Sequence, residues 1–405
     1  MASSKWWVTT AVVAVLGVGS VAGYAGFKAA EQKAIQHDPP QPLPVVHQLV
    51  QKANNHSKET KDLQALIDDP ALGSFVGRIS NASTGETIWS NEDNEPVRPA
   101  STMKVLTAAA ALLKLPHDHE VETAVVKQSA NTVVIRGGGD VRLTEENIET
   151  LADAAGTADQ VLVDTSAWKW EPMHPAWDPA DIPAGFIAPM EPVMLDQNPR
   201  SATPGLDVAK AVADRIGATS FGYTTNSDGD VVKTIKSKPL FDRLHYMMLE
   251  SDNVVAESIG REVALAVDSS GKTDPPTAVS NILKEHGISL DGARIDDTSG
   301  LSEDNLLTAK ILDDIMLKAA TSEQLRDLLY TLPVAGGTGT LKTRFNDTDG
   351  EGWVRAKTGT LTDTSSLAGT VTSRDGVVYT FALISNQSEV LPARSALDAL
   401  TTALR

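Results

Sequence analysis

Residues 99–115 read PASTMKVLTAAAALLKL. Alanine and leucine dominate this stretch and Pro116 follows it, so we expect one helix over the stretch, with Ser101 at its start. Ser101 and Lys104 stand three residues apart there, which places their side chains on one face within mutual reach. A serine hydroxyl is a poor nucleophile until a base removes its proton, and a desolvated lysine with a lowered pKa can be that base.

The Ser-x-x-Lys pattern is weak on its own. About one match is expected by chance in a chain of this length, and residues 269–272 (Ser-Ser-Gly-Lys) form a second one. We interpret the second copy as a solvated loop, because it is polar and contains glycine. Taken alone, Ser101 is better interpreted as a helix cap than as a nucleophile, so its function depends on the other motifs.

A second motif, Ser251-Asp252-Asn253, lies between two stretches of helical periodicity. A hydroxyl at Ser251 can relay a proton to a leaving amine, and the Asn253 amide can hold a substrate carbonyl. The alternative is that Ser251 or Asn253 caps the helix that follows, which is the better interpretation when this motif stands alone.

The third motif is Lys357-Thr358-Gly359, followed by Thr360, at the end of a predicted strand over residues 352–358. A lysine and a threonine hydroxyl that face one groove can bind a terminal carboxylate. Gly359 has no side chain and would let a substrate backbone approach the strand edge. This motif is expected by chance in only about one such chain in ten. The alternative is an exposed turn with a solvated lysine.

In this order, the three motifs resemble those that penicillin-binding proteins and serine β-lactamases share. Further blocks resemble the low-molecular-mass D-alanyl-D-alanine carboxypeptidase/endopeptidase family, over roughly residues 60–403. These blocks are residues 99–104, Gly137–Asp140, Asp296–Ser302, Leu332–Leu341 and Ala356–Leu361.

The patterns along the chain predict an α+β fold with an insertion. Within residues 61–116 they predict a first β-hairpin with strands at 74–80 and 86–90. Within residues 239–405 they predict helices at 241–249, 254–267, 276–286, 309–320 and 323–330, three late strands at 352–358, 366–372 and 377–385, and a closing helix at 392–404. Residues 117–238 switch to short β-like runs between loops, with one helix at 207–216. The resemblance implies a transpeptidase/β-lactamase-like catalytic domain, an antiparallel sheet flanked by helices with a helical subdomain, which a mostly β domain at 117–238 interrupts. The 147 positions from Lys104 to Ser251 are long for a β-lactamase, yet shorter than this family usually shows.

The resemblance also implies a mechanism. Lys104 deprotonates Ser101, which attacks a D-alanyl peptide bond, while the N–H groups of Ser101 and Thr360 hold the oxyanion. Asn253 orients the peptide, Ser251 protonates the departing amine, and water releases the acyl group. The expected partners are peptidoglycan stem peptides, with β-lactam antibiotics as inhibitors, and no metal or cofactor is needed.

Several activities fit these motifs. The first is a serine-type D-alanyl-D-alanine carboxypeptidase, a D-Ala-diaminoacid endopeptidase, or both. The alternatives are a β-lactamase, a D-amino-acid esterase or amidase, and a catalytically silent wall-binding protein. Two positions bear on the substrate: Glu303 stands where the family often has a basic residue, and Asp164 is a weak candidate for meeting a diaminoacid amine.

Other residues carry simpler interpretations. His117-Asp118-His119 follows a helix-ending proline and is interpreted as a solvated loop rather than a metal site, because no third ligand is in sight. Trp168, Trp170 and Trp177 are interpreted mainly as packing in the inserted domain, with stacking on a ligand as the alternative.

The N-terminus predicts export. Residues 6–27 form an apolar run after Lys5, so residues 1–27 are interpreted as a signal peptide or a membrane anchor, and the proline-rich residues 28–60 as a linker. The protein would then work outside the cytoplasm, in contact with the membrane through residues 6–27 if these are retained.

Composition narrows the class of protein. The 405 residues are 41% hydrophobic and 22% charged, which suits two or three folded domains. The net charge of −18 disfavours a nucleic-acid partner, since phosphate backbones attract basic surfaces. The sequence has no cysteine, which excludes thiol nucleophiles, disulfides and thiolate metal sites.

Overall fold

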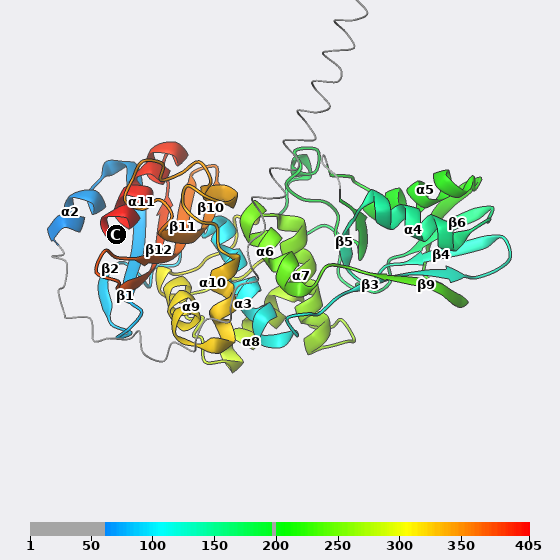
Figure 1. The fold of residues 1–405 in the computed structure, drawn as a ribbon, viewed down its shortest axis with the longest axis horizontal. Coiled ribbons are helices and arrows are strands. Elements are labelled where there is room, and N and C mark those ends of the chain that lie inside the picture. The colour runs from blue at the N-terminus through cyan, green and yellow to red at the C-terminus, as the bar shows by residue number, and fades with distance from the viewer. Residues whose placement is uncertain (1–60, 197–199) are drawn as a thin grey trace, which may run out of the picture. The chain divides into compact units, whose positions relative to one another are not determined.

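The computed structural model describes residues 61–196 and 200–405, shown in colour in Figure 1. These residues belong to one compact unit. The predicted leader, residues 1–27, and the predicted linker, residues 28–60, lie outside the described residues. Within the described part of the chain, no helix has the length and apolar character to cross a membrane.

A five-stranded antiparallel sheet joins the two ends of the described chain. Its strands lie in the order β10-β11-β12-β1-β2, so that β1 pairs with β12 and β10 is an outer strand. The predicted first hairpin and the three predicted late strands are thereby confirmed. The strands are β1 (Ser74–Asn81), β2 (Thr87–Asn91), β10 (Val354–Leu361), β11 (Thr364–Thr372) and β12 (Val378–Asn386).

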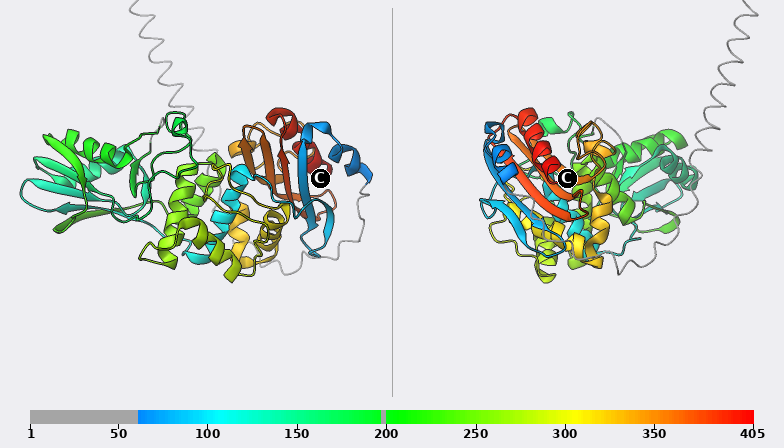
Figure 2. Two further views of the ribbon diagram at one scale, coloured as in Figure 1. Left: turned by 180° about the vertical axis from the view of Figure 1, so that it is seen from behind. Right: turned by 60° about the vertical axis from the view of Figure 1, so that its left-hand side comes forward.

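Helices cover both faces of this sheet, because side chains along each strand alternate between the faces. Ile79 and Phe381 belong to one buried cluster, with residues of α2 and α11, and Val76 and Ile384 belong to another, with residues of α9. Figures 1 and 2 show α2 in blue and α11 in red together on one side of the sheet. The three helices are α2 (Lys61–Ile67), α9 (Ala309–Thr321) and α11 (Val390–Ala403).

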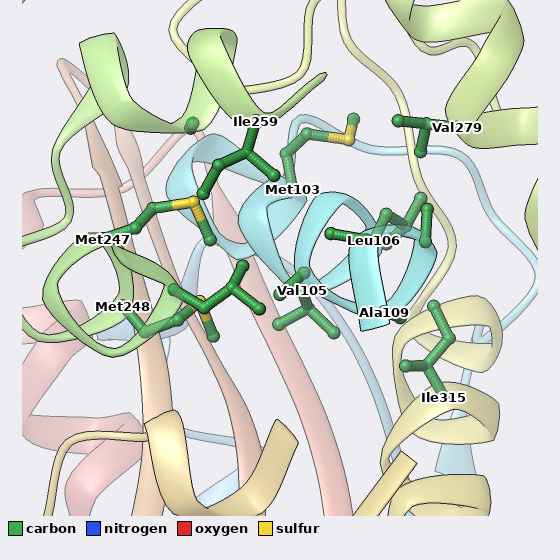
Figure 3. Close-up of a cluster of buried hydrophobic side chains, with 14 of the residues drawn as sticks. Met103, Val105, Leu106, Ala109, Met247, Met248, Ile259, Val279 and Ile315 are labelled. Atoms are coloured by element: carbon green, nitrogen blue, oxygen red, sulfur yellow. The ribbon is translucent and has the colours of Figure 1, made fainter. Parts of the chain in front are cut away.

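The helix predicted over residues 100–115 is the central helix of the helical part. Its first turn is a 3-10 turn, η2 (Ala100–Met103), and the α-helix α3 begins only at Lys104 and ends at Lys114. Figure 3 shows Met103, Val105, Leu106 and Ala109 of this helix and its first turn in one buried cluster with side chains of neighbouring helices: Met247, Met248, Ile259, Val279 and Ile315. A surrounded helix of this kind fixes the position of its N-terminus, where Ser101 lies.

The neighbours of α3 are helices that the periodicity predicted. The ends of these helices lie within two residues of the predicted ends. The exception is the start of α10, because the first turn predicted for it is a separate 3-10 turn. They are α6 (Leu240–Glu250), α7 (Asn253–Val267), α8 (Pro275–Glu285) and α10 (Arg326–Thr331).

Residues 117–238 contribute a second five-stranded sheet, in the order β8-β6-β4-β3-β9, with β4, β6 and β8 mutually parallel. Helices α4 and α5 pack on it in a third buried cluster. The limits of an inserted domain at 117 and 238 stay a prediction. The elements are β3 (Glu122–Lys127), β4 (Thr132–Arg136), α4 (Glu145–Ala155), β6 (Gln160–Asp164), α5 (Pro204–Ile216), β8 (Ser220–Thr224) and β9 (Asp230–Lys236).

Candidate active site

The structure brings Ser101 and Lys104 into direct contact. Because residues three apart nearly eclipse each other in a 3-10 turn, the Lys104 Nζ lies 3.0 Å from the Ser101 Oγ. The Lys104 Nζ also donates to the Asn253 Oδ1 at 2.6 Å and to the Ser299 carbonyl oxygen at 2.7 Å. Burial lowers the pKa of Lys104 to about 8, against the opposing effect of nearby carboxylates, chiefly Asp297.

The turn that carries Ser101 has an unusual backbone. Ala100 has a φ of 50°, a value that residues with a side chain rarely adopt. Two glycines let neighbouring segments close on this turn: a Cβ at Gly300 would lie 2.0 Å from the Ala100 carbonyl oxygen, and one at Gly359 would lie 2.7 Å from that of Pro99. Gly359 therefore allows the turn that carries Ser101 to pack closely against β10. Its expected role was a different one, to let a substrate backbone approach the strand.

A second serine–lysine contact lies beside the first. Ser251 ends α6 in the left-handed region, with a φ of 59°, and its Oγ accepts a hydrogen bond from the Lys357 Nζ at 2.7 Å. The same Nζ donates to the Thr358 carbonyl oxygen at 2.8 Å. Asp252, rather than Ser251 or Asn253, caps α7. The helix is therefore capped by the middle residue of this motif, and the side chains of Ser251 and Asn253 remain available to the active site.

Lys357 is directed at Ser251 rather than into an open groove. Its side chain is fully buried, in the interior of β10 and not at a strand end. Burial, and next the positive charge of Lys104, place the pKa of Lys357 well below its usual value. The charge of Lys104 thus disfavours the charged form of Lys357, which couples the two lysines.

The two threonines of this strand make different contacts. Because side chains alternate along a strand, Thr358 and Thr360 leave β10 on the side opposite Lys357. The Thr358 hydroxyl donates to the Thr340 Oγ1 at 2.8 Å. Thr360 is exposed, and its Oγ1 accepts a hydrogen bond from Arg394 of α11 at 3.1 Å. Arg394 was not predicted from the sequence, because no local pattern links it to residues 34 positions earlier.

A polar cavity of about 430 Å³ adjoins the second motif. The Asn253 Nδ2 donates to the Phe186 carbonyl oxygen at 3.0 Å, and Arg200 forms an ion pair with Asp252 at 2.5 Å. Residues 117–238 therefore contribute directly to the wall of the site. The cavity is lined by Gly185, Phe186, Asp196, Arg200, Tyr246, Glu250, Ser251, Asp252 and Asn253.

Asp297 organises the loop that meets Lys104. Its carboxylate accepts hydrogen bonds from the backbone N–H of Gly300 at 2.6 Å and from that of Ser302 at 2.8 Å. The Trp177 indole also donates to this carboxylate, at 2.9 Å. Trp177 is buried in the core, as the packing interpretation predicted. In addition, it binds the carboxylate of Asp297, whose loop contacts the candidate base Lys104. The 120 residues between Trp177 and Asp297 hide this contact from local patterns.

The two candidate substrate residues have partners of their own. Glu303 forms an ion pair with Arg98 at 3.1 Å, and Arg98 also holds both oxygens of Asp363 at 2.7 Å. Asp164 is buried at the end of β6, where it accepts a hydrogen bond from the Ser166 N–H at 2.9 Å. Its contact with a diaminoacid amine stays a prediction.

The remaining candidates lie in surface positions. Ser269 and Lys272 are exposed in the loop after α7, as the solvated-loop interpretation predicted. His117 stacks on Phe241 with its ring partly open to solvent, and His119 lies 3.4 Å from a carboxylate oxygen of Glu262.

Comparison with known families agrees with these motifs. The model of the D-Ala-D-Ala carboxypeptidase 3 (S13) family matches residues 59–204 and 211–404. The chain belongs to this family. The family predicted from the three motifs is confirmed, and with it the enzyme class, a serine-type D-Ala-D-Ala carboxypeptidase of the low-molecular-mass penicillin-binding proteins.

Individual relatives of this S13 member span almost its whole length. It is 41% identical to the carboxypeptidase DacB of Mycolicibacterium smegmatis, covering 100% of this chain and 99% of that protein. It is 42% identical to the carboxypeptidase Rv3627c of Mycobacterium tuberculosis, covering 85% and 83%. The crystal structure of penicillin-binding protein 4 from Haemophilus influenzae has the same fold, with a TM-score of 0.75 at 21% identity over 85% of this chain and 99% of that one. The predicted α+β fold is thereby confirmed.

Proposed function

We propose that this S13 protein removes the terminal D-alanine of peptidoglycan stem peptides through an acyl-enzyme on Ser101. The observation that carries the proposal is the 3.0 Å contact between the Ser101 Oγ and the buried Lys104 Nζ. A lysine whose pKa lies near 8 has an appreciable neutral fraction at neutral pH, and only the neutral amine can accept the serine proton.

Acylation begins with the neutral form of Lys104. Its amine takes the proton of Ser101 as the Oγ attacks the carbonyl carbon of the D-alanyl bond. The negative charge that develops on the carbonyl oxygen is held by the backbone N–H groups of Ser101 and Thr360. The first of these lies in the η2 turn, which packs against β10, the strand that carries the second.

The coupled lysines supply the proton that the leaving amine needs. When the bond breaks, the Ser251 hydroxyl gives its proton to the amine and takes one from Lys357, to which it is hydrogen-bonded. The new positive charge on Lys104 favours this loss of a proton by Lys357. In deacylation a water attacks the acyl carbon, its proton passes through Ser251 to Lys357, and Lys104 returns a proton to Ser101. Each residue then has its starting charge.

Acylation by a fluorescent penicillin tests the nucleophile. We expect Ser101→Ala to abolish covalent labelling, because it removes the hydroxyl that forms the acyl-enzyme. Ser269→Ala is the matched control, since Ser269 begins another Ser-x-x-Lys match, and it should label like the parent protein. Labelling of Ser101→Ala at the parent level would remove Ser101 from the mechanism.

The leaving group separates carboxypeptidase from endopeptidase activity, and both are compatible with this site. Purified peptidoglycan digested with the protein and analysed by mass spectrometry distinguishes them. Release of free D-alanine alone indicates carboxypeptidase activity, whereas loss of cross-linked dimers indicates endopeptidase activity. Rapid turnover of penicillin, in place of a stable acyl-enzyme, would favour the β-lactamase alternative.

The place of action follows from the substrate. Peptidoglycan is outside the cytoplasm, so we propose extracytoplasmic action, with residues 6–27 as an export signal or anchor. Fractionation of cells that produce the full chain, with N-terminal sequencing of the mature protein, tests this. Full-length protein in the cytoplasmic fraction alone would contradict it.

A further inference from the structure

The surroundings of the Lys104 amine leave one direction open for its lone pair. The Nζ lies 2.6 Å from the Asn253 Oδ1 and 2.7 Å from the Ser299 carbonyl oxygen, and amide oxygens only accept hydrogen bonds. A neutral amine has two N–H donors and one lone pair. When its donors are directed at these two oxygens, the lone pair faces the Ser101 Oγ, 3.0 Å away. The Ser299 carbonyl therefore helps to direct the base at the nucleophile.

Two side chains hold the segment that carries this carbonyl. The Glu257 Oε1 accepts a hydrogen bond from the Thr298 N–H at 2.9 Å, and the Thr107 hydroxyl donates to the Thr298 carbonyl oxygen at 2.6 Å. Gly260 lets the segment approach α7 closely, because a Cβ there would lie 2.5 Å from the Thr298 Oγ1. Glu257 therefore helps to fix the residue that directly precedes Ser299.

Charged groups on three segments interact with Glu257. Its side chain is buried, and Arg261, one turn further along α7, forms an ion pair with it at 3.4 Å. The others are Asp297, in the loop that contacts the base, and Lys104 on α3. Burial, and next the charge of Asp297, raise the pKa of Glu257 to about 7, whereas Arg261 lowers it. Glu257 is therefore ionised in the pH range above 7, in which Lys104 loses its proton.

Three carboxylates oppose the loss of this proton from Lys104. They are those of Asp297, Asp252 and Glu257, in decreasing order of effect, and each favours the cationic form of the amine. The charge of Lys104 in turn acts on the buried Lys357. Glu257 thus acts on Lys104 in two ways, through the loop that it holds and through its charge.

We propose that Glu257 is a positioning residue: it holds the segment that directs Lys104 at Ser101, and its charge favours the cationic form of Lys104. This inference rests on the function proposed above. The hydrogen bond to the loop determines how fast the neutral amine reacts, because it sets the direction of the lone pair. The charge determines the pH at which the amine becomes neutral. The two effects can therefore be measured separately.

Glu257→Gln and Glu257→Met separate the hydrogen bond from the charge. Glutamine keeps an oxygen for the Thr298 N–H and removes the charge, whereas methionine has a similar length and removes both. Without the charge, Lys104 loses its proton more easily, so both variants should lower the pH midpoint of acylation by about 0.5 unit. Only Glu257→Met should lower the rate reached at high pH, by about fivefold, the scale of one hydrogen bond. Stopped-flow fluorescence with penicillin between pH 6 and pH 9.5 gives both values.

The matched control is Glu262→Gln. Glu262 is another buried glutamate of α7, and it forms an ion pair with Arg243 as Glu257 does with Arg261. Its replacement removes the same charge from the same helix and leaves a buried arginine unpaired, so both glutamine variants should melt at lower temperatures than the parent. Glu262→Gln should nevertheless keep the parent's pH midpoint and its rate at high pH.

Each role can fail separately. Equal rates at high pH for Glu257→Gln and Glu257→Met would show that the hydrogen bond does not orient the base. The charge role is wrong if Glu257→Gln keeps the parent's midpoint, or if Glu262→Gln moves it equally. Both results leave the proposed function intact, whereas a parent protein that penicillin does not acylate would contradict that function itself. Should the single variants not fold, adding Arg261→Met to each removes the unpaired cation and keeps the same comparison.

Discussion

Two buried lysines each contact a serine in this site, and they differ in how the chain brings the contact about. Lys104 and Ser101 are three residues apart, and the 3-10 turn brings them to their 3.0 Å contact. Lys357 and Ser251 are 106 residues apart, and their 2.7 Å contact exists only where β10 meets the junction of α6 and α7. The first pair is therefore a property of local structure, and the second is a property of the fold.

The difference suits the two proposed roles. The base must stay fixed to the nucleophile in every step, which a turn of four residues at the start of a central helix ensures. The second pair acts on the leaving group, and it lies between the sheet and the helical part, beside the cavity into which a substrate can enter. A buried charge connects them, because the positive charge of Lys104 lowers the tendency of Lys357 to hold a proton.

Replacing each lysine in turn is the most direct test of whether the two serine–lysine pairs have different roles. Lys104→Met should lower the rate of acylation by penicillin by about 10⁴-fold or more, the scale seen when the base of a nucleophilic serine is removed. Lys357→Met should cost less, about 10²-fold, because general acid–base assistance to the leaving group is worth about 10²- to 10⁴-fold and Ser251 remains. Methionine has a similar length to lysine and should leave no cavity. Stopped-flow fluorescence of penicillin binding measures both rates.

A matched control for these variants is Lys272→Met. Lys272 ends the second Ser-x-x-Lys match, in an exposed loop, and its replacement should leave acylation unchanged. An equal loss in Lys104→Met and Lys357→Met would mean that the two pairs act as one unit, and the separation of roles drawn above would be wrong.

The dependence of acylation on pH sharpens the role of the first pair. The folded state lowers the pKa of Lys104 to about 8, and the reaction needs its neutral form. The acylation rate should therefore fall about tenfold for each pH unit below 8 and level off above it. The measurement is the second-order rate constant with penicillin between pH 6 and pH 9.5, compared with the melting temperature at each pH. A rate that does not change between pH 6 and pH 8 would exclude Lys104 as the base.

Local patterns predicted most of the fold. The helices around α3 have clear apolar periodicity, so α7, predicted at 254–267, was found at Asn253–Val267. Helix α4 was overlooked among β-like runs, although its ends carry standard signals: Thr144 forms a capping box with Asn147, and Gly156 follows its last residue. The signals for α4 are thus local, but the β-like patterns on both sides of it favoured a β interpretation of the whole segment.

The candidate site was predictable only as a set of motifs. Ser101 and Lys104 follow from one helix start, whereas the direction of Lys357 follows from no local pattern. A strand residue can face either side, and the choice depends on which segments pack against the strand. Arg394 was missed for the same reason, since α11 reaches Thr360 only in the folded chain.

Replacing Trp177 should have the smallest effect, and it tests whether the local Ser101–Lys104 pair also depends on a distant contact. Its indole N–H donates to Asp297, which holds the loop whose Ser299 carbonyl oxygen accepts from the Lys104 Nζ. Even the local pair is thus supported by residues distant in the sequence. Trp177→Phe removes that hydrogen bond while keeping an aromatic ring, and it should lower the acylation rate about fivefold, as expected for one hydrogen bond of about 1 kcal/mol.

Trp168 supplies the matched control, because it is equally buried in the same cluster and its Nε1 is buried without a hydrogen-bond partner in the described structure. Trp168→Phe removes the same volume and no hydrogen bond. Trp177→Phe should therefore melt at a lower temperature than Trp168→Phe, and only Trp177→Phe should slow acylation and shift its pH midpoint. If the two variants slow acylation equally, Trp177 acts through packing alone, and the catalytic base depends on its own turn without support from residues 117–238.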